Sequence, residues 1–307
     1  MNTTVSPLVS VIVITYNSSR YVIETLESVK AQTWENIELI VSDDGSADQT
    51  VQLCADWLVE NKDRFPTTKL ITVPQNTGIP ANCNRGLGAS VGDWIKLISG
   101  DDILIESAID DNLTYARQYP EASFIASDVR EIDENGVVIR DKVINEGLIH
   151  FSSLQTAKQQ VKTYSRWPVF LNTPTFFCKR EMIEKGVYFD EEFRIYEDMV
   201  VVLRSLEKGY QLHYLPKPTV SYRIHRNSIS RNMNTEVDES REKEIYKVFK
   251  KYRIPHLNVF NPLDLSVYYE IWLRFQFKGI NGHKGRRYLR KLSLNYWYMK
   301  ANGVKSY

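Results

Sequence analysis

The chain has 307 residues, of which 43% are apolar and 25% charged, and its formal net charge is +1 at neutral pH. This is an ordinary globular composition, with enough chain for one large α/β domain plus an appendage or for two domains. A net charge this close to zero provides no global field that would favour nucleic acid, so we expect no nucleic-acid partner.

Strands and helices alternate along the first hundred residues. Nearly continuous apolar, β-branched runs predict four buried strands, at 8–15, 37–42, 69–73 and 94–99. Apolar residues at helical spacing predict a helix capped by Ser18 or Ser19, a second starting at Ser46 and a third starting near Pro80. Such alternation is typical of a parallel, doubly wound sheet.

The pattern changes after residue 102. We expect a helix at 106–119, a short strand at 124–127, a hairpin turn at Asn135-Gly136 and a helix at 199–206. From about residue 232 the chain is helical in pattern, aromatic and basic.

The last part of this tail has an unusual charge distribution. Beyond Glu270 there is no acidic residue, and nine basic residues are interleaved with aromatic ones. Basic, aromatic amphipathic helices suit an anionic membrane surface. The alternative, which stays open, is a helical extension that packs on the rest of the protein and leaves its cations in solvent.

Cysteine usage and hydropathy indicate the compartment. Cys54, Cys83 and Cys178 are an odd number without close pairs, which argues against a disulfide framework and for a reducing compartment. The N-terminus lacks a signal-peptide pattern, and no stretch approaches the ~20 apolar residues of a membrane helix. We therefore expect a cytoplasmic protein, with peripheral contact to the inner face of the membrane as the open question.

Two apolar runs end in adjacent carboxylates, at Asp43-Asp44-Gly45-Ser46 and at Ser99-Gly100-Asp101-Asp102. Adjacent carboxylates repel each other, and holding them at a buried strand end costs free energy unless a cation offsets their charge. A hard divalent cation that also binds phosphate is the usual resident. Both pairs are expected at the carboxyl edge of the sheet, where α/β folds bind ligands. The alternative is that each pair only starts a turn or caps a helix.

Together with the first strand, these segments resemble the inverting family 2 glycosyltransferases of GT-A fold, of the bacterial polysaccharide type. The similarity covers roughly Leu8 to Arg231. It is carried by seven segments in order: 9–17, 26–33, Asp43-Asp44-Gly45-Ser46, 76–93, Ser99-Gly100-Asp101-Asp102, 189–198, and Tyr222-Arg223-Ile224-His225 with Ser228 and Ser230.

The resemblance implies a fold and a domain organisation. We expect an α/β protein of GT-A type, with a doubly wound, mostly parallel sheet and a helical C-terminal extension. Residues 1–105 would form the half that binds the nucleotide sugar, 106–231 the half that binds the acceptor, and 232–307 the basic, aromatic extension.

It also implies an activity. The protein would transfer a hexosyl or N-acetylhexosaminyl group from a UDP-linked donor to a hydroxyl of a saccharide or lipid-linked saccharide, assisted by Mn²⁺ or Mg²⁺. A nucleotidyltransferase of similar fold is one alternative, although residues 15–19 lack the Gly-rich basic loop of that class. A non-catalytic saccharide-binding protein is another, and it would need neither Asp102 nor Asp198.

The resemblance assigns the metal site. Asp102 would be the metal carboxylate, and Asp101 would meet sugar or ribose hydroxyls, or the metal through water. His225 would complete the metal shell or bind a phosphate, which Arg223 could neutralise. The chain has Ser99 where the commonest form of the family has a further acidic residue, which weakens a ribose contact but leaves the metal carboxylate in place.

Asp44 would accept the ring N–H of uracil, and Asp43 would support the loop. The other residues placed near the nucleotide are Thr15, Tyr16, Asn17, Asn76 and Asn84. For Asn76 and Asn84, a turn or helix-cap role remains the alternative.

Asp198 would be the general base that deprotonates the acceptor hydroxyl, with Glu197 as second choice. A carboxylate at a helix start is favoured in its ionised form, which fits a base but also fits a plain cap. Trp167 would be a stacking platform for the acceptor sugar, with a buried core tryptophan as the alternative.

Overall fold

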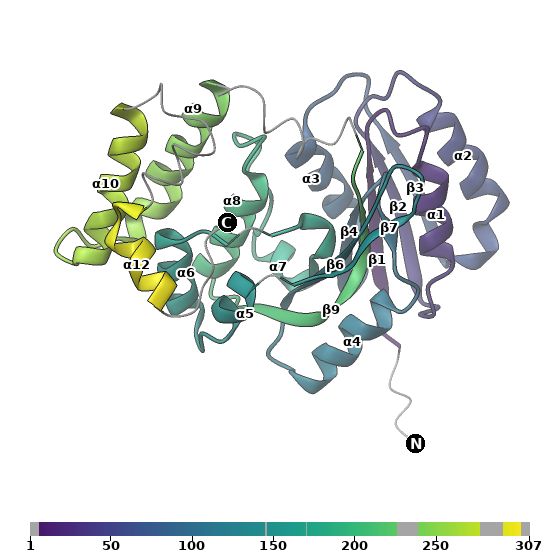
Figure 1. Ribbon diagram of the computed structural model, residues 1–307. Helices are drawn as coiled ribbons and strands as arrows, with labels where there is room; N and C mark the ends of the chain where they lie inside the picture. The colour runs from purple at the N-terminus through teal and green to yellow at the C-terminus, as the bar shows by residue number, and fades with distance from the viewer. Residues whose placement is uncertain (1–5, 145, 170, 226–238, 277–290, 302–307) are drawn as a thin grey trace.

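A computed structural model describes residues 6–144, 146–169, 171–225, 239–276 and 291–301. A mixed sheet lies between two layers of helices, and the C-terminal helices gather at the end remote from α1 and α2 (Figure 1).

The first four strands pair in parallel with one another, as predicted. They are β1 (Val9–Thr15), β2 (Ile37–Asp43), β3 (Thr67–Thr72) and β4 (Trp94–Ser99), in the order β3-β2-β1-β4. The helices between them are α1 (Val22–Lys30), α2 (Thr50–Glu60) and α3 (Ile79–Ala89), and η1 (Lys62–Arg64) is a short 3₁₀ turn.

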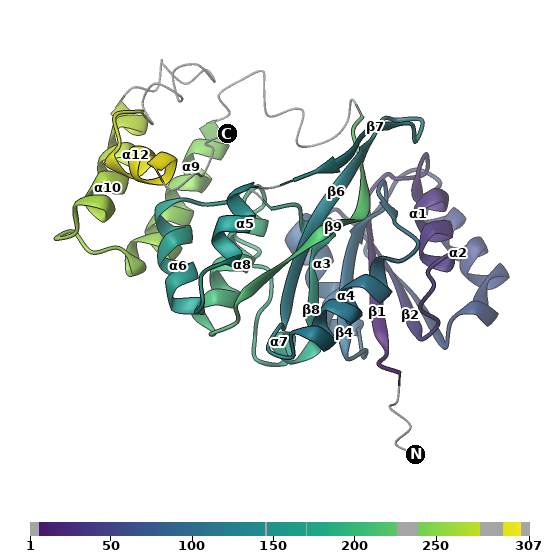
Figure 2. The same ribbon diagram turned by 60° about the horizontal axis from the view of Figure 1, so that its bottom comes forward.

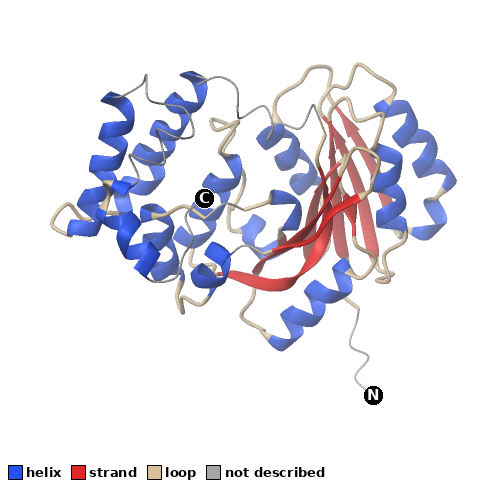
Figure 3. Ribbon diagram, viewed as in Figure 1, coloured by secondary structure: helices blue, strands red, loops and turns tan. Residues whose placement is uncertain are grey.

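The alternation of side chains along β1 explains why helices cover both faces. Val11 and Val13 pack in one cluster with residues of α1 and α2, whereas Ile12 packs in another with Cys83 and Leu87 of α3. Figure 3 shows the same arrangement, with helices on both sides of the strands. The doubly wound prediction is confirmed.

Two predicted helix starts are wrong. Helix α1 begins at Val22 after Tyr21, and neither Ser18 nor Ser19 caps it with a side chain. Helix α2 begins at Thr50, where Asp48 Oδ1 accepts the Thr50 N–H (3.0 Å). The serines of these loops hydrogen-bond within the carboxyl edge of the sheet instead.

The second half extends the same sheet. Strand β8 (Phe177–Lys179) is antiparallel between β4 and β6 (Phe124–Ile132), and β6 pairs in parallel with β9 (Leu212–Arg223). Strand β5 (Ile103–Leu104) forms the far edge, and β7 (Val138–Val143) pairs with β6 across the predicted hairpin, where Gly136 has φ 82°. Strand β6 is longer than predicted because β9 pairs along its length (Figure 2).

The helices of this half are α4 (Ala108–Gln118), α5 (Glu146–Ser152), α6 (Ala157–Arg166), α7 (Arg180–Glu184) and α8 (Glu197–Glu207), with the 3₁₀ turn η2 (Thr173–Thr175). Helices α6 and α8 share the core cluster of α3. One sheet and one core cluster therefore run through residues assigned to both halves.

The extension is helical where it is described. It contains α9 (Glu239–Val248), the π-helical turn η4 (Phe249–Arg253), the 3₁₀ turn η5 (Ile254–His256), α10 (Pro262–Gln276) and α12 (Leu294–Ala301). Val248 and Tyr252 join the core cluster of α6 and α8, and Asn295 Nδ2 donates to the carbonyl of Arg166 (2.9 Å). Among the described helices, none has the length and apolar character needed to cross a bilayer.

Candidate active site

Both acidic pairs lie at the carboxyl edge of the sheet, as predicted. The backbone N–H of Asp44 donates to the carbonyl of Thr15 (3.0 Å), and that of Gly100 donates to the carbonyl of Ile14 (2.8 Å). A Cβ at Gly100 would lie 2.8 Å from Thr15 Cγ2, so the turn before Asp101 is packed too tightly for a side chain.

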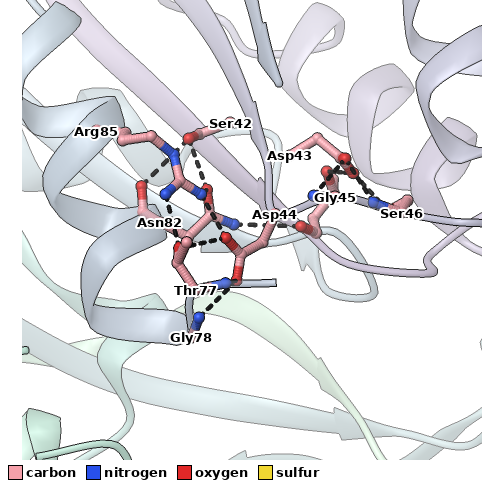
Figure 4. A network of polar contacts seen from close by, with 10 residues as sticks. Ser42, Asp43, Asp44, Gly45, Ser46, Thr77, Gly78, Asn82 and Arg85 are labelled. Atoms are coloured by element: carbon pink, nitrogen blue, oxygen red, sulfur yellow. Dashed lines mark hydrogen bonds and ion pairs between the residues drawn. The ribbon is translucent and has the colours of Figure 1, made fainter. Parts of the chain in front are cut away.

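Asp43 supports the loop that carries Asp44. Its buried carboxylate accepts from the hydroxyls of Thr15 (2.8 Å) and Ser46 (2.5 Å) and from the backbone N–H groups of Gly45 (3.1 Å) and Ser46 (2.9 Å). The turn part of this network is visible in Figure 4. The expectation for Asp43 is confirmed.

Asp44 is buried and bonded on both carboxylate oxygens (Figure 4). Oδ1 accepts from the Thr77 hydroxyl (2.6 Å) and from Arg85 Nη2 (2.5 Å), and Oδ2 accepts from the N–H groups of Thr77 (3.0 Å) and Gly78 (2.7 Å). Burial alone would raise the pKa of Asp44, but these bonds outweigh it and hold the pKa below its usual value. A carboxylate has about four acceptor positions, and in this conformation all are used.

The other residues expected around the nucleotide differ in exposure. Tyr16 and Asn76 are exposed, and Asn17, with φ 50°, accepts the N–H of Ala47 on Oδ1 (2.9 Å). Thr15 is buried with its hydroxyl bonded inside the loop, so it shapes the edge of the sheet and does not face a ligand.

Asn84 contacts the segment 189–196, which leads into Glu197 and Asp198 and is called the base loop below. Its Nδ2 donates to the Phe189 carbonyl (3.0 Å) and to Glu191 Oε1 (2.9 Å), and its Oδ1 accepts the Phe189 N–H (3.0 Å). Asn84 therefore ties α3 to the base loop, and its amide is occupied by protein.

Sequence reasoning missed two residues of α3 that organise the carboxyl edge of the sheet around Asp44. This part of the edge is called the donor edge below. Asn82 Nδ2 donates to the Thr15 carbonyl (3.2 Å) and its Oδ1 accepts from the Ser42 hydroxyl (2.6 Å), while Arg85 forms the ion pair with Asp44. The available signal was spacing, because residues 82 and 85 lie three apart on one face of a helix.

The end of β9 holds the second acidic pair. The Arg223 N–H donates to Asp102 Oδ1 (2.8 Å), while the Arg223 side chain donates to the Asp101 carbonyl (2.7 Å) and to Glu24 Oε2 (2.6 Å). His225 Nε2 lies 3.0 Å from Asp101 Oδ2. The structure thus brings these predicted residues together, and the buried Arg223 guanidinium braces the turn through its bonds to Asp101 and Glu24.

Asp102 has a buried oxygen, Oδ2, without a hydrogen-bond partner. Burial, and then the charge of Asp101, raise the pKa of Asp102 well above its usual value, although Arg223 and Lys96 oppose this. An unsatisfied buried acceptor costs about 1–3 kcal/mol. A hard cation bound there would remove that cost, so the carboxylate fits a divalent metal.

The protein supplies few further metal ligands. Within the described ranges there is no group of three or more His, Cys, Asp or Glu that could hold a metal ion. A cation at Asp102 would therefore take most of its ligands from phosphate and water, as Mg²⁺ commonly does.

Glu197 and Asp198 lie in the first turn of α8, which begins two residues earlier than predicted. Burial raises the pKa of Asp198 to about 6, although the Met199 N–H (2.6 Å from Oδ1) lowers it. Burial, and then the charge of Asp198, raise the pKa of Glu197 to about 8, and Glu197 Oε2 is buried without a partner. Burial thus moves the titration of both carboxyls toward neutral pH, and the two titrate as a pair.

The base loop reaches the donor edge at Gly78. A Cβ added to Gly78, which has φ 99°, would lie 3.5 Å from Arg194 Nε of the base loop. The Gly78 N–H also donates to Asp44. The base loop, which leads into Asp198, therefore lies beside the loop that holds Asp44.

The sequence pattern of the family described as "Glycosyl transferase family 2" matches residues 10–186, which is more than half of the chain. This chain belongs to glycosyl transferase family 2. The match includes both acidic pairs and ends before the base loop. The roles of Asp198, Arg223 and His225 therefore depend on geometry and remain proposals.

Curated relatives have names that agree with this assignment. Glycosyltransferase GlyG of Streptococcus pneumoniae serotype 4 is 25% identical over 250 residues, covering 80% of this chain and 79% of that protein. Succinoglycan biosynthesis protein ExoO of Rhizobium meliloti is 28% identical over 238 residues, covering 73% of this chain and 63% of that protein.

Solved structures confirm the GT-A-type fold. S. aureus TarS 1-349 in complex with UDP-GlcNAc matches with a TM-score of 0.58 at 17% identity, covering 97% of this chain and 88% of that chain. Mannosyltransferase PcManGT from Pyrobaculum calidifontis, in complex with GDP-Man and Mn²⁺, matches with a TM-score of 0.61 at 16% identity, covering 98% and 80%.

Trp167 lies within the family match, but the structure does not present it as an acceptor platform. It is 7% exposed and packs with Tyr296 and Met299 of α12. A stacking platform needs an accessible ring face, so Trp167 is better described as an anchor for α12. Ser228 and Ser230 of the last predicted segment lie outside the described residues.

Proposed function

We propose that this family 2 glycosyltransferase moves a sugar from a UDP-linked donor to a hydroxyl of a saccharide or lipid-linked saccharide, with inversion at the anomeric carbon. The observation that carries the proposal is the buried, unpartnered Oδ2 of Asp102 at the edge of the sheet that also holds Asp44. This edge offers a cation position for a diphosphate and a polar loop for a base.

The choice of UDP rests on Asp44 and on the comparisons. TarS, a structural neighbour, is recorded in complex with UDP and with UDP-GlcNAc. Asp44 remains our proposed acceptor for the ring N–H of uracil. Because its four acceptor positions are bonded in this conformation, base binding would exchange one of them, and the Arg85 side chain, which is 21% exposed, is the more accessible partner.

A divalent cation held by Asp102 would stabilise the negative charge that develops on the leaving diphosphate. The residues of this chain prepare that position. The Arg223 N–H fixes Asp102 Oδ1, which leaves Oδ2 as the free ligand, and His225 stands beside Asp101 at the same turn.

Asp198 would remove the proton of the attacking hydroxyl. Burial raises the pKa of Asp198 to about 6, which suits a base that must also release the proton afterwards. A single displacement of this kind inverts the anomeric configuration.

A panel of UDP-sugars tests the proposal. We expect one or more donors to be hydrolysed or transferred in the presence of Mn²⁺ or Mg²⁺ and to be stable in chelator. Release of diphosphate from a nucleoside triphosphate would favour the nucleotidyltransferase alternative. Saccharide binding without donor turnover would favour the non-catalytic alternative.

A peripheral membrane contact is a second proposal, and exposed aromatic residues favour it. Phe260 is 92% exposed, and Trp272 of α10 and Trp297 of α12 are about half exposed, with Lys300 lying 5.2 Å from the Trp297 ring centroid. Aromatic rings next to cations are typical of surfaces that touch anionic lipid headgroups.

A further inference from the structure

The start of α8 lacks a cap from its own sequence. Its N-cap residue is Tyr196, which makes no side-chain capping bond. The N–H groups just before and at the helix start would be left without partners, as at any uncapped N-terminus. In this protein they are satisfied by Glu244 of α9: its Oε1 accepts the N–H of Ile195 (2.7 Å) and that of Tyr196 (2.9 Å).

The rest of the base loop is held by the same part of the chain. Tyr252 donates its hydroxyl to Asp190 Oδ2 (2.5 Å), and Lys251 Nζ binds both Asp190 (2.8 Å) and Glu192 (2.9 Å). Asn84 holds the loop from the opposite side, through Phe189 and Glu191. The base loop is therefore clamped between α3 and the C-terminal extension, and Glu244 is the contact nearest to Asp198.

We propose that Glu244 is a positioning residue for the Asp198 base, which makes α9 of the C-terminal extension a working part of the transferase site. The inference rests on the proposed function. By capping α8 from another part of the chain, Glu244 fixes the first turn on which Asp198 stands. A base displaced by about 1 Å can cost up to ~100-fold in rate, so this contact bears on catalysis.

The charge of Glu244 acts on the same pair. It contributes to the raised pKa of Glu197 and so favours the state with the proton on Glu197. The other described groups around the pair are Cys83 of α3 and Tyr164 of α6, with Arg253 near Tyr164. Burial raises the pKa of both Cys83 and Tyr164, so both stay neutral, and Glu244 is the charged acid that faces the pair from α9.

Two variants of full-length protein separate position from charge. Glu244→Ala removes the cap, and we expect kcat to fall about tenfold with unchanged donor KM and UDP affinity, because the donor edge is not touched. Glu244→Gln keeps an acceptor oxygen but no charge. We expect it to restore most of kcat, because the amide oxygen can still accept the N–H groups of Ile195 and Tyr196.

Glu207→Ala is the matched control. It removes the contact between Glu207 and His256 (2.9 Å), which joins the same extension to the opposite end of α8. We expect kcat and the pH profile of this variant to match wild type.

Wild-type kcat in Glu244→Ala, or an equal fall in Glu207→Ala, would overturn the positioning role. If Glu244→Ala melts below the assay temperature, Glu244→Gln decides, and a kcat far below wild type in this variant counts against the proposal. These results differ from failure of the proposed function, in which wild type itself would turn over no donor.

Discussion

The two ends of the site treat buried carboxylates in opposite ways. At the donor edge, Asp44 is bonded on every acceptor position and its pKa is held below the usual value. After the base loop, in the first turn of α8, Glu197 has a buried oxygen without a hydrogen-bond partner, and the pKa values of Glu197 and Asp198 are raised to about 8 and about 6. One end holds a charge in place, and the other has the raised pKa values that our proposal of proton transfer requires.

The two ends also differ in where their support comes from. The partners of Asp44 lie on the loop and helix that follow β3, within the N-terminal half of the sheet domain. The base loop depends on α9, which belongs to the C-terminal extension beyond β9. The two ends of the site are thus supported by different parts of the chain.

The largest expected effect concerns Asp102, whose Oδ1 accepts a bond from the Arg223 N–H while its buried Oδ2 has no hydrogen-bond partner. Asp102→Asn keeps the shape but removes the charge, so we expect turnover to be abolished and UDP binding in Mn²⁺ to weaken. Titrating each protein with UDP, once in Mn²⁺ and once in chelator, measures its UDP affinity with and without metal. Asp93→Asn, at the other end of β4, is the control and should behave as wild type. Equal UDP affinity in Asp102→Asn and wild type, with and without metal, would refute the metal assignment.

At the base loop, Asp198→Asn removes the proton acceptor without changing size. We expect turnover to fall by ~10²–10⁴-fold, the usual contribution of general-base catalysis, with UDP affinity retained. Single-turnover rates and calorimetric UDP titration separate the two. Near-normal turnover would reject Asp198 as the base, and NMR of the product must show the anomeric configuration opposite to that of the donor.

At the donor edge, the comparison predicts an effect on binding and not on the chemical step. Asp44→Ala loses a buried hydrogen bond to the base, so we expect donor KM to rise by roughly 5- to 100-fold. Because the loop is also disturbed, Arg85→Gln serves as control: it breaks the ion pair but leaves Asp44. If Asp44 reads uracil, wild type and Arg85→Gln should prefer UDP over CDP, and Asp44→Ala should lose that preference. A preserved preference would leave Asp44 as a turn residue only.

The smallest effect is expected away from both ends. Replacing Trp272 and Trp297 by Ala should reduce co-sedimentation with vesicles of anionic phospholipid, with little change in donor hydrolysis in solution. Tyr119→Ala, an exposed aromatic on the sheet domain, is a matched control. If the double variant binds vesicles as wild type does, packing on the domain is sufficient to explain the extension.

The sequence predicted the parts of the fold that are written in short, continuous patterns. Strands β1, β2 and β4 are buried on both faces, and their nearly continuous apolar runs placed them within a residue or two. Strand β8 has three residues and owes its place to pairing with β4 and β6, so no local pattern could indicate it. The helix start at Ser46 was wrong because Ser46 is used by Asp43, and the cap at Ser18 was wrong because its hydroxyl donates to the Tyr16 carbonyl.

The candidate residues were located better than their roles. The resemblance pointed to Arg223 and Asn84, but one braces the turn at Asp101 and the other clips the base loop. Glu244 was missed altogether. Its bonds go to backbone N–H groups of a segment remote in sequence, and such contacts leave no residue pattern to read.

The pairing of β6 with β9 also sets an order in which parts of the protein can fold during synthesis. Phe124 pairs with Leu212 and Ile132 with Arg223, so this part of the sheet closes a long loop, as does the pairing of β1 with β4, but it must wait until the whole of β1 to β4 and the residues up to β9 have been made. During synthesis the donor edge can form early, but Asp102 receives its bond from Arg223 only after β9 leaves the ribosome. Pulse-labelled amide exchange should show β9 protected later than β1. The cation position would then be finished last, so a nascent chain would fold most of its donor half before it can capture metal and nucleotide.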